Sequence, residues 1–187
     1  MRTAARRRCP RLAASAAWAD PGLALPDPAL LARLQRGCNA LGLALEPAQA
    51  EQLIAYLELL LKWNSAYNLT AVREPAQMVT RHLLDSLAVA PYLRGQNLLD
   101  VGTGAGLPGI PLAILYPERR ISLLDSNGKK TRFLFQVKTA LRLDNMQVHH
   151  ARVESFRPPA PYDAVLSRAF ASLADMVAAC THLLAPQ

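Results

Sequence analysis

The sequence has few cysteines and no long apolar run. Its three cysteines, Cys9, Cys38 and Cys180, lie far apart without zinc or redox spacing, so we expect reduced thiols in a cytoplasmic protein. No apolar run approaches the roughly 18 residues that a membrane-spanning helix needs, and we expect no membrane association. The first residues also lack the apolar segment of a secretory signal, which argues against secretion.

Acidic residues are in the minority. The chain of 187 residues has 21 Lys and Arg against 14 Asp and Glu, a net charge of +7. Residues 1–29 hold five arginines and two aspartates, so this Arg- and Ala-rich leader, which we expect to be disordered, carries +3 of that total. The positive net charge favours a polyanionic partner, because Lys and Arg neutralise phosphates and release counterions. Many enzymes are equally basic, so charge alone does not identify the partner.

Hydrophobic residues make up 51% of the chain, enough for the core of one domain. Residues 30–95 show helical periodicity in three segments, 30–41, 47–67 and 75–91. From Asn97 the pattern changes to short apolar runs that alternate with helical segments. The expected strands are 97–101, 121–125, 146–153 and 162–168, and the expected helices are 107–115, 129–143 and 172–184. This alternation predicts an α/β fold with a doubly wound, mostly parallel sheet over residues 96–187, preceded by a helical subdomain.

A glycine-rich turn, Asp100-Val-Gly-Thr-Gly-Ala-Gly-Leu-Pro-Gly109, follows the first expected strand. Glycines there allow unusual backbone angles and let a ligand approach the main chain closely. Asp125 ends the second strand, 23 residues beyond Gly102, at the distance expected for an acid that binds the ribose of a nucleoside cofactor.

The turn fits two classes of cofactor. Gly104-Ala-Gly-Leu-Pro-Gly109 also satisfies the dinucleotide pattern G-x-G-x-x-G, so a nicotinamide or flavin enzyme is an alternative. Asp100, placed at the mouth of the turn, would repel a pyrophosphate but could attract a sulfonium or ammonium group. The turn alone favours S-adenosylmethionine and leaves the dinucleotide open.

Five motifs in order make the comparison specific. They are Lys62-Trp-Asn-Ser-Ala-Tyr-Asn-Leu-Thr70, Arg81-His-Leu-Leu-Asp-Ser86, the turn 100–111, Leu123-Leu-Asp-Ser126 and Ser167-Arg-Ala-Phe-Ala-Ser-Leu173. From about Leu30 onward the chain closely resembles the RsmG family, also called GidB, of bacterial methyltransferases that modify N7 of guanine 527 in 16S rRNA. The resemblance implies a class I, Rossmann-like methyltransferase fold. The family's last strands, which include a Leu-Lys-Gly segment, have no counterpart, so we expect a sheet truncated at the C-terminus.

The resemblance also implies site residues. The family's contacts with S-adenosylmethionine match Gly102, Leu107, Val153, Glu154 and Arg168, and the turn and the ribose-binding acid add Gly104 and Asp125. It implies the small ribosomal subunit as partner, a monomer, no metal and no catalytic acid or base, since guanine N7 carries a lone pair and no proton. Two other functions stay open, an NAD-dependent oxidoreductase and a truncated remnant that binds RNA without catalysis.

Several side chains have both a functional and a structural interpretation. Trp63 and Tyr67 suit core packing, and His82 suits a hydrogen-bonded structural role, paired with Asp85. Phe170 would stack on an extruded guanine or pack in the core. The basic residues of the helix at 129–143 would follow RNA phosphates or form a solvated face; these are Lys129, Lys130, Arg132, Lys138 and Arg142.

Overall fold

Four parallel strands form the sheet of the computed structural model, which describes residues 27–168 and 172–185. They are β1 (Asn97–Val101), β2 (Arg120–Asp125), β3 (Met146–His150) and β4 (Ala164–Leu166), in the order β3-β2-β1-β4. The predicted doubly wound parallel sheet is therefore confirmed. The last two strands are shorter than predicted, and residues Val153–Ser155 form a 3-10 turn, η3.

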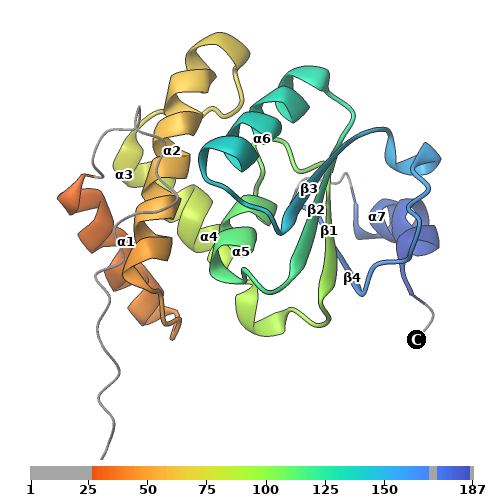
Figure 1. Ribbon diagram of the computed structural model, residues 1–187, viewed down its shortest axis with the longest axis horizontal. Coiled ribbons are helices and arrows are strands. Elements are labelled where there is room, and N and C mark those ends of the chain that lie inside the picture. The colour runs from red at the N-terminus through yellow and green to blue at the C-terminus, as the bar shows by residue number, and fades with distance from the viewer. Residues whose placement is uncertain (1–26, 169–171, 186–187) are drawn as a thin grey trace, which may run out of the picture.

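Helices cover both faces of this sheet (Figure 1). One face carries α5 (Gly109–Leu115) and α6 (Gly128–Ala140), which connect successive strands, together with the N-terminal helices α1 (Pro28–Ala40) and α2 (Pro47–Tyr67). The other face carries α7 (Leu173–Cys180), followed by a 3-10 turn, η4 (Thr181–Leu183). Side chains of β1 alternate between the two layers, so Leu98 packs with α2 and α6 while Leu99 packs with α7.

The starts of α1 and α2 follow from their sequences. Asp27 caps α1 by accepting from the backbone N–H of Ala29, and Pro28 takes the first helical position. The helix thus begins two residues before the predicted Leu30. The expected disordered leader, 1–29, otherwise lies outside the described residues. In α2, Glu46 and Gln49 form a capping box around Pro47.

The third predicted helix is divided into four pieces. These are α3 (Pro75–Met78), a π-helix η1 (Val79–Leu84), α4 (Asp85–Leu87) and a 3-10 turn η2 (Ala90–Tyr92). A π-helix is wider than an α-helix and is frequent at functional sites. Sequence periodicity does not reveal this widening, which changes the direction in which the residues after it point.

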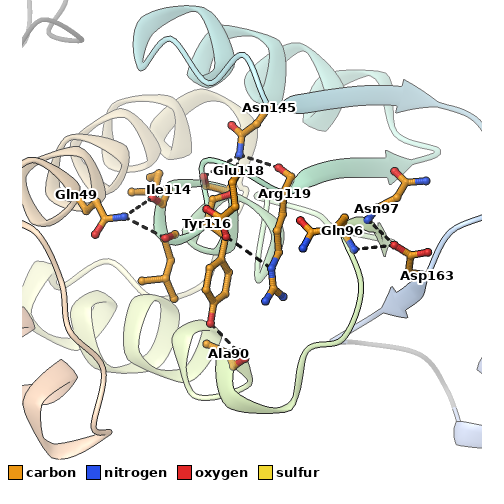
Figure 2. Close-up of polar contacts among 12 residues, drawn as sticks. Gln49, Ala90, Gln96, Asn97, Ile114, Tyr116, Glu118, Arg119, Asn145 and Asp163 are labelled. Atoms are coloured by element: carbon orange, nitrogen blue, oxygen red, sulfur yellow. Dashed lines mark hydrogen bonds and ion pairs between the residues drawn. The ribbon is translucent and has the colours of Figure 1, made fainter.

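Polar side chains close the amino edge of the sheet (Figure 2). The Asn145 amide donates to the carbonyl groups of Ala113, Tyr116 and Arg119 at 3.0–3.2 Å. Asp163 accepts from the backbone N–H groups of Gln96 and Asn97 at 2.6 and 2.8 Å. The loops at this edge are bound to one another, whereas the carboxyl edge contains the cavity described next.

Candidate cofactor site

A cavity of about 340 Å³ opens at the carboxyl ends of β1, β2 and β3. Its lining residues come from the ends of these strands and the loops that follow; they are Val101, Gly102, Leu124, Asp125, Ser126, Lys130, Ala151, Arg152, Val153 and Glu154. Ligands of open α/β folds bind at this edge. Of the seven predicted site residues, Gly102, Asp125, Val153 and Glu154 meet in this one cavity.

Gly102 gives the cavity an open stretch of main chain. Its φ is +65°, in the left-handed region that favours glycine, and beyond Gly102 and its two chain neighbours no atom lies within 4 Å of the position that a Cβ would take. A ligand can therefore lie directly against the backbone. The fit of a nucleoside cofactor rests on this free space together with the acid beside it.

That acid is Asp125, whose side chain is 6% exposed. Its Oδ2 accepts from the backbone N–H of Gly104 at 2.9 Å, and its Oδ1 accepts from the backbone N–H of Asn127 at 2.8 Å. The Lys130 ammonium lies 3.7 Å from Oδ2. Backbone donors from both neighbouring loops thus orient the carboxylate, and Gly104 acts through Asp125 rather than by lining the cavity.

Asp100 lies beneath the turn and not at its mouth, where the sequence had placed it. It is fully buried, and its Oδ2 accepts from the Thr103 hydroxyl at 2.6 Å and from the backbone N–H of Gly109 at 2.8 Å. Burial raises the pKa of Asp100 to about 7, although its two hydrogen bonds and the charge of Arg168 act in the opposite direction.

This position of Asp100 bears on the dinucleotide alternative. A pyrophosphate in a dinucleotide site receives backbone N–H groups from the start of the following helix. Here the N–H of Gly109, the first residue of α5, already donates to the Asp100 carboxyl. Asp100 therefore already accepts from a backbone N–H group that a bound pyrophosphate would need as a free donor.

Leu107 lies in the core and does not line the cavity. It is 7% exposed and belongs to the hydrophobic cluster between the sheet and the N-terminal helices. Beside it, the Tyr56 hydroxyl of α2 donates to the carbonyl of Ala105 at 2.8 Å. This hydrogen bond attaches the glycine turn to α2 on the side of the core.

Arg168 follows β4 at the carboxyl edge but is directed toward the N-terminal helices. Its guanidinium lies 3.1 Å from the Asp85 carboxylate and 3.5 Å from the Ser86 hydroxyl. Asp85 therefore pairs with Arg168 and not with His82, contrary to the sequence interpretation. Phe170, the predicted stacking residue, lies outside the described residues.

His82 instead joins two of the motifs. Its Nε2 lies 2.8 Å from the Thr70 hydroxyl, and the Asn64 amide exchanges two hydrogen bonds with the backbone of Thr70. Burial lowers the pKa of His82, so the neutral ring is favoured. The motifs 62–70 and 81–86 thus form one polar network next to the Asp85–Arg168 pair.

Lys130 and Arg152 line the cavity but were not predicted as site residues. The sequence places Lys130 among the basic residues of the helix at 129–143, which would follow RNA phosphates or form a solvated face. Arg152 immediately precedes the Val153–Glu154 pair, which was the available signal. His149 and His150 point to different neighbours, the Phe156 ring and the Ser126 carbonyl, as expected for consecutive strand residues.

In the described part of the chain, no three His, Cys, Asp or Glu side chains group as metal ligands, and no helix is long and apolar enough to span a membrane.

Comparison with known proteins identifies the family. The model of the GidB family, rRNA small subunit methyltransferase G, matches residues 49–187. The chain is 61% identical over 151 residues to ribosomal RNA small subunit methyltransferase G of Pseudomonas aeruginosa (strain LESB58). The aligned region covers 80% of this chain and 71% of that protein. The enzyme of the same name from Pseudomonas syringae pv. syringae is 59% identical over 150 residues, covering 80% and 70%.

A solved structure shares the fold. Coclaurine N-methyltransferase bound to N-methylheliamine and SAH aligns with a TM-score of 0.50 and 13% identity, covering 84% of this chain and 54% of that one. This likeness supports the class I methyltransferase fold. With the family match over most of its length and the sequence identity, the chain belongs to the rRNA small subunit methyltransferase G family.

Proposed function

We propose that this chain transfers a methyl group from S-adenosylmethionine to N7 of guanine 527 in bacterial 16S rRNA. Membership of the rRNA small subunit methyltransferase G family supports the reaction class and the substrate. The structural observation that carries the proposal is the cavity that unites Gly102, Asp125, Val153 and Glu154. Open backbone beside a fixed carboxylate suits a nucleoside.

Each cavity residue has a distinct role in this proposal. Asp125 accepts hydrogen bonds from ribose hydroxyls, and Gly102 lets the cofactor lie against the main chain. Val153 and Glu154 bound the cavity from the side of β3. S-adenosylmethionine, when bound, supplies a methyl group on a positively charged sulfur.

The remaining predicted residues support this arrangement from outside the cavity. Gly104 orients Asp125 through its N–H group, and Leu107 anchors the turn in the core. We propose that Arg168, which the family resemblance assigns to contact with the cofactor, also binds the RNA. Because guanine N7 must stay free to react, Arg168 pairs with O6 or with a phosphate rather than with N7.

The methyl transfer requires little acid or base chemistry from individual side chains. Guanine N7 has a lone pair and no proton, so the displacement needs no general base and no Lewis acid, and we assign no catalytic residue and no metal. The chain accelerates the reaction by holding N7 about 3–3.5 Å from the methyl carbon and by excluding water.

Two measurements test the proposal. Isothermal titration should give micromolar affinity for S-adenosylhomocysteine and no binding of NAD(H); the reverse would favour an oxidoreductase. Labelled S-adenosylmethionine should transfer its methyl group to 30S subunits from cells that lack this methylation, and primer extension after borohydride reduction and aniline cleavage of the RNA should locate the product. A folded chain that binds cofactor but labels no rRNA would favour the alternative of a non-catalytic remnant.

We also propose a cytoplasmic monomer in which residues 30–95 form a helical subdomain and 96–187 bind the cofactor. The packing of α2 against α5 and α6 in one hydrophobic cluster supports a close union of these parts. Light scattering after gel filtration should give the mass of one chain, 20.4 kDa.

A further inference from the structure

A row of aromatic rings leads from the glycine turn to the surface. Tyr56, which is fully buried and bonded to the turn, lies 6.4 Å from Phe133. Phe133 lies 5.8 Å from Trp63, and Trp63 stacks on Tyr67 with ring centroids 5.1 Å apart and planes inclined by 29°. The inner rings are buried and the outer two are half-buried. The row therefore ends in a stacked pair that solvent can reach.

This pair lines a groove of about 400 Å³ between α2 and α6. Its other lining residues are Lys62, Ala66 and Gln136. On α6, Lys129 and Arg132 lie seven and four residues before Gln136 and so share its helix face. All three are exposed, and Phe135 beside them is 52% exposed.

Positive charge dominates around the groove. The whole of α6 contains no acidic residue, and its first turn lies next to Asp125 of the cofactor cavity. The nearest acid on α2 is Glu58, one turn before Lys62, and its raised pKa reflects burial and the charge of Asp27 at the start of α1. Core packing accounts for the inner edge of Trp63 against Phe133, but it does not account for the exposed cations grouped around a stacked pair.

We propose that this surface, formed by Lys62, Trp63, Tyr67, Arg132 and Phe135, binds unpaired nucleotides of the RNA beside the target guanine. The inference rests on the proposed function and adds the surface that receives the substrate. Aromatic rings stack with unpaired bases of any sequence, and neighbouring cations neutralise the phosphates. Arg132 of this surface lies two residues after Lys130, which lines the cofactor cavity, so RNA bound here approaches the site of methyl transfer.

Tryptophan fluorescence tests the stacking directly. The chain has two tryptophans, so the substitution Trp18→Phe leaves Trp63 as the reporter. With S-adenosylhomocysteine present to fill the cofactor cavity, single-stranded oligoadenylate should quench Trp63 emission saturably. Heparin has the charge of a polyanion without bases and should bind with little quenching. Unchanged emission when anisotropy shows the RNA bound, or equal quenching by heparin, would overturn the proposal.

Steady-state methylation of 30S subunits gives a second test. Trp63→Leu and Tyr67→Leu keep an apolar side chain but remove the flat ring, and each should raise KM for the subunit about tenfold. Lys62→Gln and Arg132→Gln should each lower the slope of log affinity against log salt by about 0.7. Affinity for S-adenosylhomocysteine should stay at the wild-type value, which reports an intact fold.

Tyr92→Leu and Arg94→Gln are matched controls. Tyr92 is 80% exposed, Arg94 is exposed, and both precede β1 at the amino edge of the sheet. They should leave KM and the salt slope unchanged. If the groove variants behave as these controls do, the surface does not bind RNA. If wild-type protein methylates no 30S subunits, the proposed function fails instead, and the quenching experiment still decides whether the groove binds RNA.

Discussion

Asp100→Asn tests whether the fold keeps a carboxyl group protonated beneath the glycine turn. Asp100 is fully buried, and its Oδ1 has no hydrogen-bond partner while Oδ2 accepts two. Burial raises its pKa from 3.8 to about 7. An acid whose pKa is higher in the folded state stabilises the fold below its unfolded pKa, and this stabilisation is lost as pH rises through the folded pKa.

The size of the effect follows from the two pKa values. In the window between them, each pH unit removes about 1.4 kcal/mol of stability. Asp100 should therefore lower the free energy of unfolding by about 2–3 kcal/mol between pH 5 and pH 8, with most of the loss below pH 7. Asn has the same shape, accepts from Thr103 and Gly109 through one oxygen, and does not titrate in this range.

Urea denaturation of both proteins from pH 5 to pH 8 measures this effect. The difference in unfolding free energy between Asp100→Asn and wild type isolates Asp100, because the other titrating groups are common to both. The variant should gain about 2–3 kcal/mol relative to wild type as pH rises over this range. A constant difference would refute the reasoning, since it would mean that Asp100 titrates at its ordinary pKa.

Asp163→Asn is a control, because the pKa of Asp163 is shifted in the opposite direction from that of Asp100. The backbone N–H groups of Asn97 and Gln96 lower the pKa of Asp163 at the exposed amino edge. Its contribution is present above the unfolded pKa and is lost as pH falls through the folded pKa, so this variant should differ from wild type near neutral pH and converge with it in acid.

Three other substitutions test the site and its supports. Asp125→Ala should weaken S-adenosylhomocysteine binding by about 1–3 kcal/mol in calorimetry through lost ribose hydrogen bonds, and unchanged affinity would remove Asp125 from the site. Asp85→Asn should lower kcat by releasing Arg168, whereas Asp85→Glu should retain activity. Both variants should change the free energy of unfolding by less than about 1 kcal/mol, because the Asp85–Arg168 pair is exposed to solvent. His82→Gln should become more stable relative to wild type as pH falls below 6.5, because the lowered pKa of His82 disfavours its protonation in the fold; an equal pH dependence of the two proteins would contradict this.

Features encoded by neighbouring residues were predictable from the sequence. The strand β1, the glycine turn and the acid that ends β2 follow from a change of hydrophobic period and from spacing along the chain. Parallel strands end at the same edge of the sheet, so Gly102, Asp125 and the Val153–Glu154 pair had to meet there once the order of elements was known.

Features that depend on packing were not predictable in this way. The π-helix 79–84 adds a residue to a turn without altering the apolar pattern, and it determines where Asp85 points. The burial of Asp100 follows from the path of the turn above it, which sequence spacing does not specify. Lys130 has the composition of a surface residue, and its approach to Asp125 arises only because α6 begins at the end of β2.

The helical N-terminal part supports the site directly. The turn contains three glycines in left-handed conformation, and because glycine loses more backbone entropy on folding than other residues, ordering this turn is costly without outside contacts. Tyr56 supplies one such contact through the Ala105 carbonyl, and Asp85 supplies another by holding Arg168 at the end of β4. Both reach the carboxyl edge from helices that precede the sheet in sequence. The motifs in those helices can therefore act on methyl transfer without touching the cofactor, by fixing the turn and Arg168.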